Sequence, residues 1–399
     1  MTAPDVSRSL HIFLVAGEES GDRLGAGLMR ALKSRHRGDV IFSGVGGQEM
    51  AKEGLASLFP LDDLAVMVFA AVIRRLPLIF HRIRETAAAA VAARPDVLVI
   101  IDSPDFTHRV ARRVRAAAAS IPIVDYVSPS VWAWRPWRAR AMRAYVDHVL
   151  ALLPFEPGVH ARLGGPRCTY VGHPLVERAH LLRPNETEAA RRLSDPPLLL
   201  VLPGSRSGEI RRLLGVFAQA IESLRQSVGA LDVVIPTVPH LYAELKEATA
   251  AWPASVRVIV AEEEKYAAFR SARAALAKSG TVTLELAVAG VPMVAAYRVS
   301  AIEAMIVRRL TRAAVRSLAR APSVILVNLV LGENVVPEFL QEACTAEKLT
   351  AALLPLFSDT PARQRQVEAF GRLDAVMEIG SANPSARAAE IVLREAGVV

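Results

Sequence analysis

Two carboxylates follow a run of five Val, Leu and Ile residues in the segment VLVIIDSPDF, at Asp102 and Asp105. Such a run is typical of a buried parallel strand, and α/β folds present reactive groups just past the carboxyl ends of these strands. An aspartate in a partly desolvated cleft can accept a proton from a hydroxyl, so Asp102 is a candidate general base. The alternative is structural, with Asp102 forming a turn and Asp105 capping a helix expected over residues 106–115.

A glycine-rich turn precedes a helical pattern in VAGEESGDRLGAGLMRAL, residues 15–32. Glycines permit close backbone approach, and the free N–H groups at the start of a helix attract anions, so this turn can contact a phosphorylated ligand. No Gly-Lys-Ser/Thr follows, which excludes a P-loop. The alternative is an ordinary strand-to-helix turn capped by Ser20 or Asp22. The candidate contact residues are Gly17, Ser20 and Gly21.

A second turn of this kind occurs in LPGSRSGEIRRLL, residues 202–214. A helix is expected to start near residues 207–209, directly after Gly204, Ser205 and Arg206. Backbone amides, the serine hydroxyl and the guanidinium group can converge there on a diphosphate. An arginine in such a turn is more informative about function than one on a helix face.

A third turn, in AKSGTVTLELAVAG, is followed by an acid at a useful spacing. Ser279, Gly280 and Thr281 open a predicted helix and offer another anion site. Glu285 lies four residues after Thr281, one turn further along nearly the same helix face. A carboxylate there can bind the two hydroxyls of a ribose. The alternative makes Thr281 a helix cap and Glu285 a solvated acid.

Tryptophan and arginine are concentrated in VDYVSPSVWAWRPWRARAMR, residues 124–143, which holds three of the four tryptophans of the chain. This density can provide stacking and phosphate contacts. It is equally compatible with an aromatic loop wedged between two domains.

Large apolar residues bordered by arginines fill residues 64–84, LAVMVFAAVIRRLPLIFHRIR. This composition favours a helix lying in a membrane interface, or a groove for acyl chains. The alternative is a buried helix pair broken at Pro77. No stretch reaches the roughly 20 apolar residues that a spanning helix needs. The candidate membrane or acyl-chain contacts are Val66, Met67, Val68, Phe69, Val72, Ile73, Arg74 and Arg75.

These candidate sites are separated by alternating strand and helix patterns, which predict an open parallel sheet with helices on both faces. The first series has strands at 11–16, 40–45, 97–101, 123–127, 148–153 and 169–171, with helices at 25–35, 82–93, 109–119 and 139–145. Residues 177–197, which are polar and rich in proline, are expected to be a linker. The alternation then restarts with strands at 198–202, 233–236, 256–260, 274–277 and 293–297. Two successive series predict two Rossmann-like domains.

Composition agrees with two domains and points to an anionic partner. The chain has 399 residues, more than one hydrophobic core usually serves, and its mean hydropathy of +0.28 excludes a largely disordered protein. A net charge of +8 favours a phosphorylated metabolite or an anionic lipid. Nucleic acid is not expected, because the chain shows no zinc-finger spacing, RNA-binding aromatic signature or basic tail. The two cysteines show no metal-ligand spacing, which suits a reducing cytoplasm, and the N-terminus does not resemble a secretion signal.

Taken together, the motifs resemble the lipid-A-disaccharide synthase family along nearly the whole chain. The resemblance is carried by LVAGEESGD, IDSPDF, YVSPSVWAWR, LPFE, YVGHPLVE, LPGSR, SGTVTLELA with VPMVAAYR, and VNLVLGENVVPEFLQEAC. It implies an α/β fold of the GT-B type, with two facing Rossmann-like domains and a deep interdomain cleft. The implied acceptor and membrane-associated domain covers residues 1–178, completed by C-terminal helices from about 370–399. The implied UDP-sugar-binding domain covers residues 195–369.

The resemblance also implies a reaction and residue roles. UDP-2,3-diacylglucosamine would donate its sugar to 2,3-diacylglucosamine 1-phosphate, with inversion and without metal or other cofactor, at the cytoplasmic face of an inner membrane with an anionic surface. Asp102 matches the family's candidate base, and Glu18 in AGEESGD is a second candidate acid. Arg206, Glu285 and Asn328 match positions expected to hold UDP, together with the three glycine-containing turns. A homo-oligomer is compatible with this reading.

Three departures from the family pattern leave other functions to consider. Residues 67–71 lack the Gly and Glu usual in the apolar segment, Glu333 stands where a basic residue is usual, and the stretch between Tyr297 and Ser323 is longer. One alternative is a diverged glycosyltransferase with another lipid acceptor. Another is a UDP-sugar epimerase of GT-B-like fold, which would not need the apolar segment. A non-catalytic descendant would be expected to have lost its candidate acids and arginine, and these are present.

Overall fold

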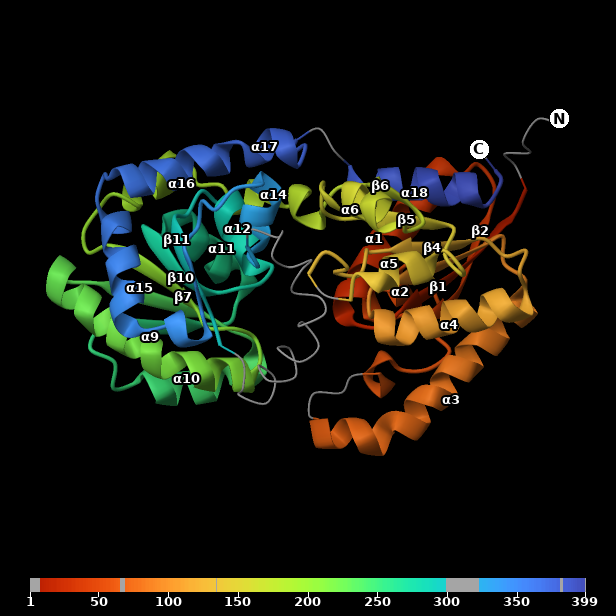
Figure 1. The fold of residues 1–399 in the computed structure, drawn as a ribbon, viewed down its shortest axis with the longest axis horizontal. Helices are drawn as coiled ribbons and strands as arrows, with labels where there is room; N and C mark the ends of the chain where they lie inside the picture. Colours follow the sequence, from red (N-terminus) through yellow and green to blue (C-terminus); the bar gives the residue numbers. More distant parts are fainter. Residues whose placement is uncertain (1–7, 65–68, 134, 299–322, 381–382, 399) are drawn as a thin grey trace. The chain divides into compact units, whose positions relative to one another are not determined.

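A computed structural model describes residues 8–64, 69–133, 135–298, 323–380 and 383–398, and for residues 69–75 it describes the backbone alone. The chain divides into two compact units (Figure 1). Unit 1 consists of residues 1–176 and 381–399, and unit 2 consists of residues 177–380.

Unit 1 is built on a six-stranded parallel sheet with the order β2-β1-β3-β4-β5-β6. Its strands are β1 (Leu10–Ala16), β2 (Val40–Val45), β3 (Val97–Ile101), β4 (Ile123–Tyr126), β5 (His148–Ala151) and β6 (Arg167–Tyr170). All five residues of β3 are buried, because helices cover both faces of the sheet. An unbroken apolar run is therefore the expected sequence for this central strand.

The helices of unit 1 include one from the far end of the chain. They are α1 (Glu19–Arg35), α2 (Gln48–Lys52), α3 (Phe69–Ala93), α4 (Pro104–Ala117), α5 (Trp137–Met142), α6 (Glu156–Leu163) and α18 (Pro384–Glu395), with 3-10 turns at Leu61–Asp63 and Pro174–Val176. Helix α18 packs against α1, and Val392 shares a core cluster with Leu28 and Leu32 (Figure 1). Residues near the C-terminus thus complete the N-terminal unit.

Helix α3 differs from the sequence prediction. A helix was expected from residue 82, with a break at Pro77 as one alternative, but the helix begins at Phe69 and continues through Pro77. A proline inside a helix removes one backbone hydrogen bond, which side-chain packing can offset. Ile83, Ala87 and Ala90 provide that packing, because all three are buried in the cluster beneath the sheet.

Unit 2 repeats the architecture with the strand order β12-β11-β10-β7-β8-β9, again all parallel. Its strands are β7 (Leu198–Leu202), β8 (Asp232–Pro236), β9 (Ser255–Ile259), β10 (Ala274–Lys278), β11 (Met293–Tyr297) and β12 (Glu338–Leu340). The predicted fold of two parallel sheets is confirmed, although the three-residue strand β12 was not predicted.

The helices of unit 2 cover both faces of its sheet, and Phe217 of the longest one lies in the core with Leu276 of β10. The helices are α7 (Ala179–Leu182), α8 (Glu186–Arg191), α9 (Ser207–Val228), α10 (Tyr242–Thr249), α11 (Glu262–Ser271), α12 (Val282–Val288), α14 (Leu326–Leu331), α15 (Ala346–Leu353), α16 (Pro361–Gly371) and α17 (Leu373–Val376), with 3-10 turns at Pro239–Leu241, Gln341–Ala343 and Leu354–Phe357. Among the residues described, no helix has the length and apolar character needed to span a bilayer.

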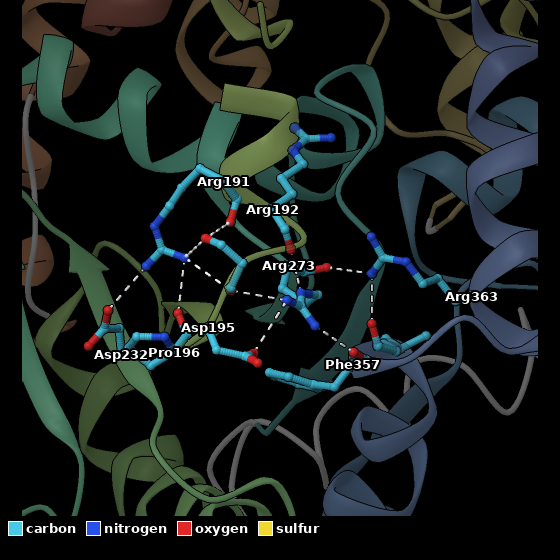
Figure 2. A network of polar contacts seen from close by, with 10 residues as sticks. Arg191, Arg192, Asp195, Pro196, Asp232, Arg273, Phe357 and Arg363 are labelled. Carbon is cyan, nitrogen blue, oxygen red and sulfur yellow. Dashed lines mark hydrogen bonds and ion pairs between the residues drawn. The ribbon is translucent and has the colours of Figure 1, made fainter. Parts of the chain in front are cut away.

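Residues 177–197 are an ordered part of unit 2, so the linker prediction is wrong. Helices α7 and α8 pack against α11, and Asn185 caps α8 in a capping box with Glu188. The guanidinium group of Arg192 donates four hydrogen bonds of 2.6–3.2 Å to backbone carbonyls, and burial lowers its pKa to about 10. Figure 2 shows the surrounding network, in which Arg273 donates to the carbonyls of Arg192 and Phe357.

Candidate functional site

The strand order of each sheet reverses at one place, where α/β folds bind ligands beyond the carboxyl ends of the strands. In unit 1 the chain runs from β1 to β2 on one side and then to β3 on the other. In unit 2 it runs from β7 through β8 to β9, and then to β10 on the opposite side of β7. The glycine-rich turns and Asp102 follow these strands, so both reversal points hold predicted site residues.

At the reversal point of unit 1, each of two carboxylates accepts a hydrogen bond from a serine that lies close to the other one in sequence. Ser20 Oγ donates to Asp102 Oδ2 at 3.1 Å, and Ser103 Oγ donates to Glu18 Oε1 at 2.9 Å. Asp102 Oδ1 also accepts from the amide of Ser103 at 2.8 Å. The structure therefore brings Asp102 together with Glu18 and Ser20, which belong to a different sequence motif. A carboxylate held in this way, at an accessible strand end, has the geometry of a general base.

Gly17 and Gly21, both predicted site residues, allow the turn after β1 to lie close to the end of β3 and the turn that follows it. A Cβ atom at Gly17 would lie 2.4 Å from Ser103 Cβ, and one at Gly21 would lie 3.1 Å from the carbonyl oxygen of Ile101. The predicted capping of α1 by Ser20 or Asp22 is wrong. Asp22 is buried and instead accepts hydrogen bonds of 2.7–3.0 Å from the amides at the start of α2.

Asp105 lies apart from this cluster. Ser103, not Asp105, occupies the N-cap position of α4, so the predicted cap is wrong. The Asp105 side chain is 79% exposed and pairs with Arg138 at 2.6 Å and Arg135 at 3.9 Å. It therefore helps to hold the loop that carries tryptophan and arginine.

The tryptophans of that loop occupy different environments. Trp132 Nε1 donates to Glu156 Oε1 at 3.3 Å, and its ring contacts Phe155 edge to face. Trp137 is 58% exposed, and Trp134 lies outside the described residues. Burial raises the pKa of Glu156 to about 8, because an ionised carboxylate is costly away from water. Trp132 is thus an anchor of the loop.

The turn after β7 contains Gly204 and the exposed side chain of Arg206. Gly204 has a φ of +123°, which favours glycine, and a Cβ atom there would lie 2.6 Å from Glu209 Oε2. The Arg206 side chain is 74% exposed, with Nη1 3.5 Å from Glu209 Oε1. Helix α9 begins at Ser207, within the predicted range, so Ser205 and the first amides of the helix adjoin this cation.

The turn after β10 does not have the arrangement that the structural alternative predicts. Thr281 occupies the N-cap position of α12 but its side chain makes no capping hydrogen bond, so the predicted cap is wrong. Glu285 is only 19% exposed and accepts from Lys265 Nζ at 2.8 Å, which contradicts a solvated acid. Ser279 is buried and Gly280 is half-buried. The ion pair fixes Glu285 one turn beyond these residues.

The side chain of Asn328 bonds to neighbouring protein groups. Its side chain is fully buried, Nδ2 donates to Ser323 Oγ and the carbonyl of Val336, and Oδ1 accepts from the amides of Val335 and Val336. These bonds use both donors and two acceptor positions of the amide. Direct binding of a ligand by Asn328 stays a prediction and would require one of them to open. Nearby Glu333 pairs with Arg372 at 2.6 Å.

The apolar segment is only partly described. Val66, Met67 and Val68 lie outside the described residues, and Phe69, Val72, Ile73, Arg74 and Arg75 belong to α3 without a description of their side chains. Further along α3, Phe80 and Ile83 line a pocket together with Arg109, Arg112 and Arg113 of α4. Within the described parts of the chain, none of these three arginines pairs with a carboxylate.

Two lysines that the sequence did not single out pair with acids at the turns of unit 2. Lys265 holds Glu285, and Lys278 forms an ion pair with Glu209 at 3.0 Å. Lys278 had a visible signal, because it ends an apolar strand and directly precedes the Ser-Gly-Thr turn. Over the described ranges, no group of three His, Cys, Asp or Glu side chains could hold a metal ion.

Known proteins resemble the chain over nearly its full length. The family model described as lipid-A-disaccharide synthetase matches residues 12–392. The lipid-A-disaccharide synthase of Nitrobacter hamburgensis is 60% identical to this chain, over 98% of this chain and 96% of its own length. That of Rhodopseudomonas palustris is 61% identical, over 98% of this chain and 97% of its own length.

Solved structures support the fold alone, because their sequences are distant. MurG of Acinetobacter baumannii has a TM-score of 0.60 at 14% identity, covering 97% of this chain and 100% of its own. The S. aureus MnaA-UDP co-structure has a TM-score of 0.65 at 12% identity, covering 98% of both chains. The fold is therefore GT-B-like. The family match and the identity to full-length relatives show that the chain belongs to the lipid-A-disaccharide synthase family, the glycosyltransferases that make the lipid A disaccharide.

Proposed function

We propose that the chain transfers 2,3-diacylglucosamine from UDP-2,3-diacylglucosamine to the 6-hydroxyl of 2,3-diacylglucosamine 1-phosphate, with inversion at the anomeric carbon. The products are the β-1′,6-linked disaccharide 1-phosphate and UDP. The observation that carries this proposal is the position of Asp102 at the reversal point of unit 1, held by Ser20 and the Ser103 amide. Unit 1 is then the acceptor domain and unit 2 the nucleotide domain.

The chemistry needs one base and one place for negative charge. Asp102 accepts the proton of the acceptor hydroxyl as its oxygen bonds to the anomeric carbon, and the bond from that carbon to the UDP oxygen breaks. Glu18, linked to the same cluster through Ser103, orients the acceptor. Gly17, Ser20 and Gly21 provide a narrow backbone surface against which the donor sugar lies.

Unit 2 supplies the nucleotide contacts. Arg206, which is exposed beside the Gly204–Ser205 turn, donates to the diphosphate and stabilises the departing UDP without a metal. Glu285, held by Lys265, accepts from the ribose hydroxyls. The diphosphate lies against the turn formed by Ser279, Gly280 and Thr281. Asn328 contributes indirectly, by holding the loop at residues 335–336.

The lipid chains require a surface, and we propose that α3 and α4 provide it at the cytoplasmic face of the inner membrane. Leu76 and Phe80 are both 39% exposed and lie four residues apart on α3, so they present apolar surface on the same side of the helix. Arg109, Arg112 and Arg113 of α4 line a pocket with Phe80, and none of them pairs with a carboxylate of the described residues, so their charges can match an anionic lipid surface. Replacing Val68, Phe69 and Ile73 with serine should release the protein from anionic vesicles, and unchanged sedimentation would place the anchor elsewhere.

Incubation with the two monosaccharide precursors tests the reaction directly. The expected result is equimolar formation of disaccharide 1-phosphate and UDP, detected by mass spectrometry and by a coupled assay for UDP. Omission of the acceptor is the control. Release of UDP with a free, epimerised sugar would favour an epimerase instead, and no product with this acceptor but product with another lipid would indicate a diverged transferase.

A further inference from the structure

An ion pair connects the two turns that follow β7 and β10. Lys278, the last residue of β10, places Nζ 3.0 Å from Oε1 of Glu209 in the first turn of α9. The two strands are neighbours, with Ala277 opposite Leu202. The pair thus spans the reversal point of unit 2, where ligands bind in this class of fold.

Glu209 also holds the turn that contains Arg206. The same Oε1 atom lies 3.5 Å from Arg206 Nη1, and Oε2 lies so close to Gly204 that a Cβ atom there would approach it to 2.6 Å. The two cations differ in freedom. The Arg206 side chain is 74% exposed, whereas that of Lys278 is 19% exposed. Glu209 contacts the less exposed Lys278 more closely, at 3.0 Å, than the exposed Arg206, at 3.5 Å.

The net positive charge of Arg206, Glu209 and Lys278 together favours binding of a polyanion. Two cations share one carboxylate, which leaves a net charge of +1 beside a proposed diphosphate site. An ammonium group has three donors, so Lys278 can keep Glu209 and still donate to a second acceptor. Gly280 leaves space for that acceptor, because a Cβ atom at this position would lie in van der Waals contact with Lys278 Nζ, at 3.8 Å, and glycine leaves that position empty.

We propose that Lys278 is a second diphosphate-binding cation of the nucleotide site, and that Glu209 is the residue that positions it between the two turns. The proposal rests on the UDP site proposed above. Lys278 Nζ donates to a diphosphate oxygen of the bound donor and stays in contact with the same group as UDP leaves. No covalent bond forms or breaks at Lys278, which acts by stabilising the charge on the leaving diphosphate.

Titration of the full chain with UDP and with uridine tests this role. Lys278→Met keeps the length of the side chain but removes its charge, and should lower UDP affinity about 10- to 100-fold, as expected for a hydrogen bond between charged groups. Affinity for uridine, which has no phosphate, should change less than twofold. Lys278→Arg should retain most of the UDP affinity. Lys246→Met on α10 is the matched control and should leave both affinities unchanged.

A double variant separates a direct contact from simple neutralisation of Glu209. If Glu209→Gln with Lys278→Met still binds UDP at least tenfold more weakly than Glu209→Gln alone, Lys278 contacts the diphosphate. If the double variant binds as well as the single one, Lys278 only neutralises Glu209 and the proposal is wrong. Equal losses for UDP and uridine would indicate a structural effect and would also overturn it.

Two reference measurements distinguish this proposal from the site on which it depends. If the wild-type chain does not bind UDP, or if Glu285→Ala leaves its affinity unchanged, the nucleotide site itself is wrong. If the wild type binds UDP, Glu285→Ala weakens binding and Lys278→Met does not, the nucleotide site stands and Lys278 has no part in it.

Discussion

Asp102 and Ser103 have φ values of 54° and 43°, which few residues other than glycine adopt. Strained backbone of this kind persists where surrounding contacts enforce it, and it clusters at functional sites. Here it turns the Asp102 carboxylate toward Ser20 and the Ser103 hydroxyl toward Glu18. The strain and the hydrogen bonds together support a catalytic role for this turn.

Asp102→Asn should lower kcat by a factor of about 10² to 10⁴, the usual range for loss of a general base, because the amide cannot accept the proton. UDP affinity should stay within twofold, since we assign the nucleotide to unit 2. Measurements of kcat and of UDP binding by calorimetry check both. Asp105→Asn is the matched control, because Asp105 is exposed and turned toward Arg138. Normal turnover of the Asp102 variant would remove this residue from the base role.

Glu156 has a pKa of about 8 in the folded chain, well above its ordinary value. The folded state therefore holds a proton that the unfolded state releases, and stability falls as the pH rises from about 5 to 8, by roughly 1.4 kcal/mol per pH unit at the steepest. Glu156→Gln cannot ionise and should flatten this fall. Urea unfolding of both proteins at pH 5, 6.5 and 8 gives the comparison, and parallel pH profiles would show that burial of Glu156 does not control stability.

Unbroken apolar strands are easier to predict from the sequence than the segments around them. The limits of β3, β7 and β11 match the prediction, because a strand buried on both faces needs apolar residues throughout. The sequence of residues 177–197 predicts a linker instead of helices, because the order of this segment depends on partners far away in the sequence. Arg192 bonds carbonyls 77–98 residues further along the chain, and no local pattern shows such contacts.

The meeting of the turns after β1 and β3 depends on the absence of a side chain at Gly17. Gly17→Ala should separate them, because its Cβ atom would lie 2.4 Å from Ser103 Cβ. We expect a loss of activity of at least tenfold. Gly215→Ala in α9 is a matched control with open space, and should stabilise the chain by about 0.5–1 kcal/mol. Full activity of the Gly17 variant would mean that the contact between these turns is not needed for transfer.

The chain contains the same arrangement of strands twice, once in each unit. Each unit has a six-stranded parallel sheet whose order reverses once, and each reversal point holds charged residues. The sequence predicted this duplication because the alternation of strands and helices restarts at residue 198. It did not predict the charged pairs, since Lys278 and Glu209 are 69 positions apart and meet only after β10 inserts beside β7.

Hydrogen exchange can test the assignment of the nucleotide to unit 2 and of the acceptor to unit 1. UDP alone should slow exchange of unit 2, most strongly at residues 204–209 and 278–285, because binding stabilises the folded unit by about 2.7 kcal/mol at a UDP concentration of 100 Kd. Exchange at residues 17–22 and 102–107 should not change until 2,3-diacylglucosamine 1-phosphate is added. ADP at the same concentration is the control for nucleotide specificity. Protection of unit 1 by UDP alone, with none in unit 2, would reverse the assignment, and equal protection by ADP would show that the site does not select uridine.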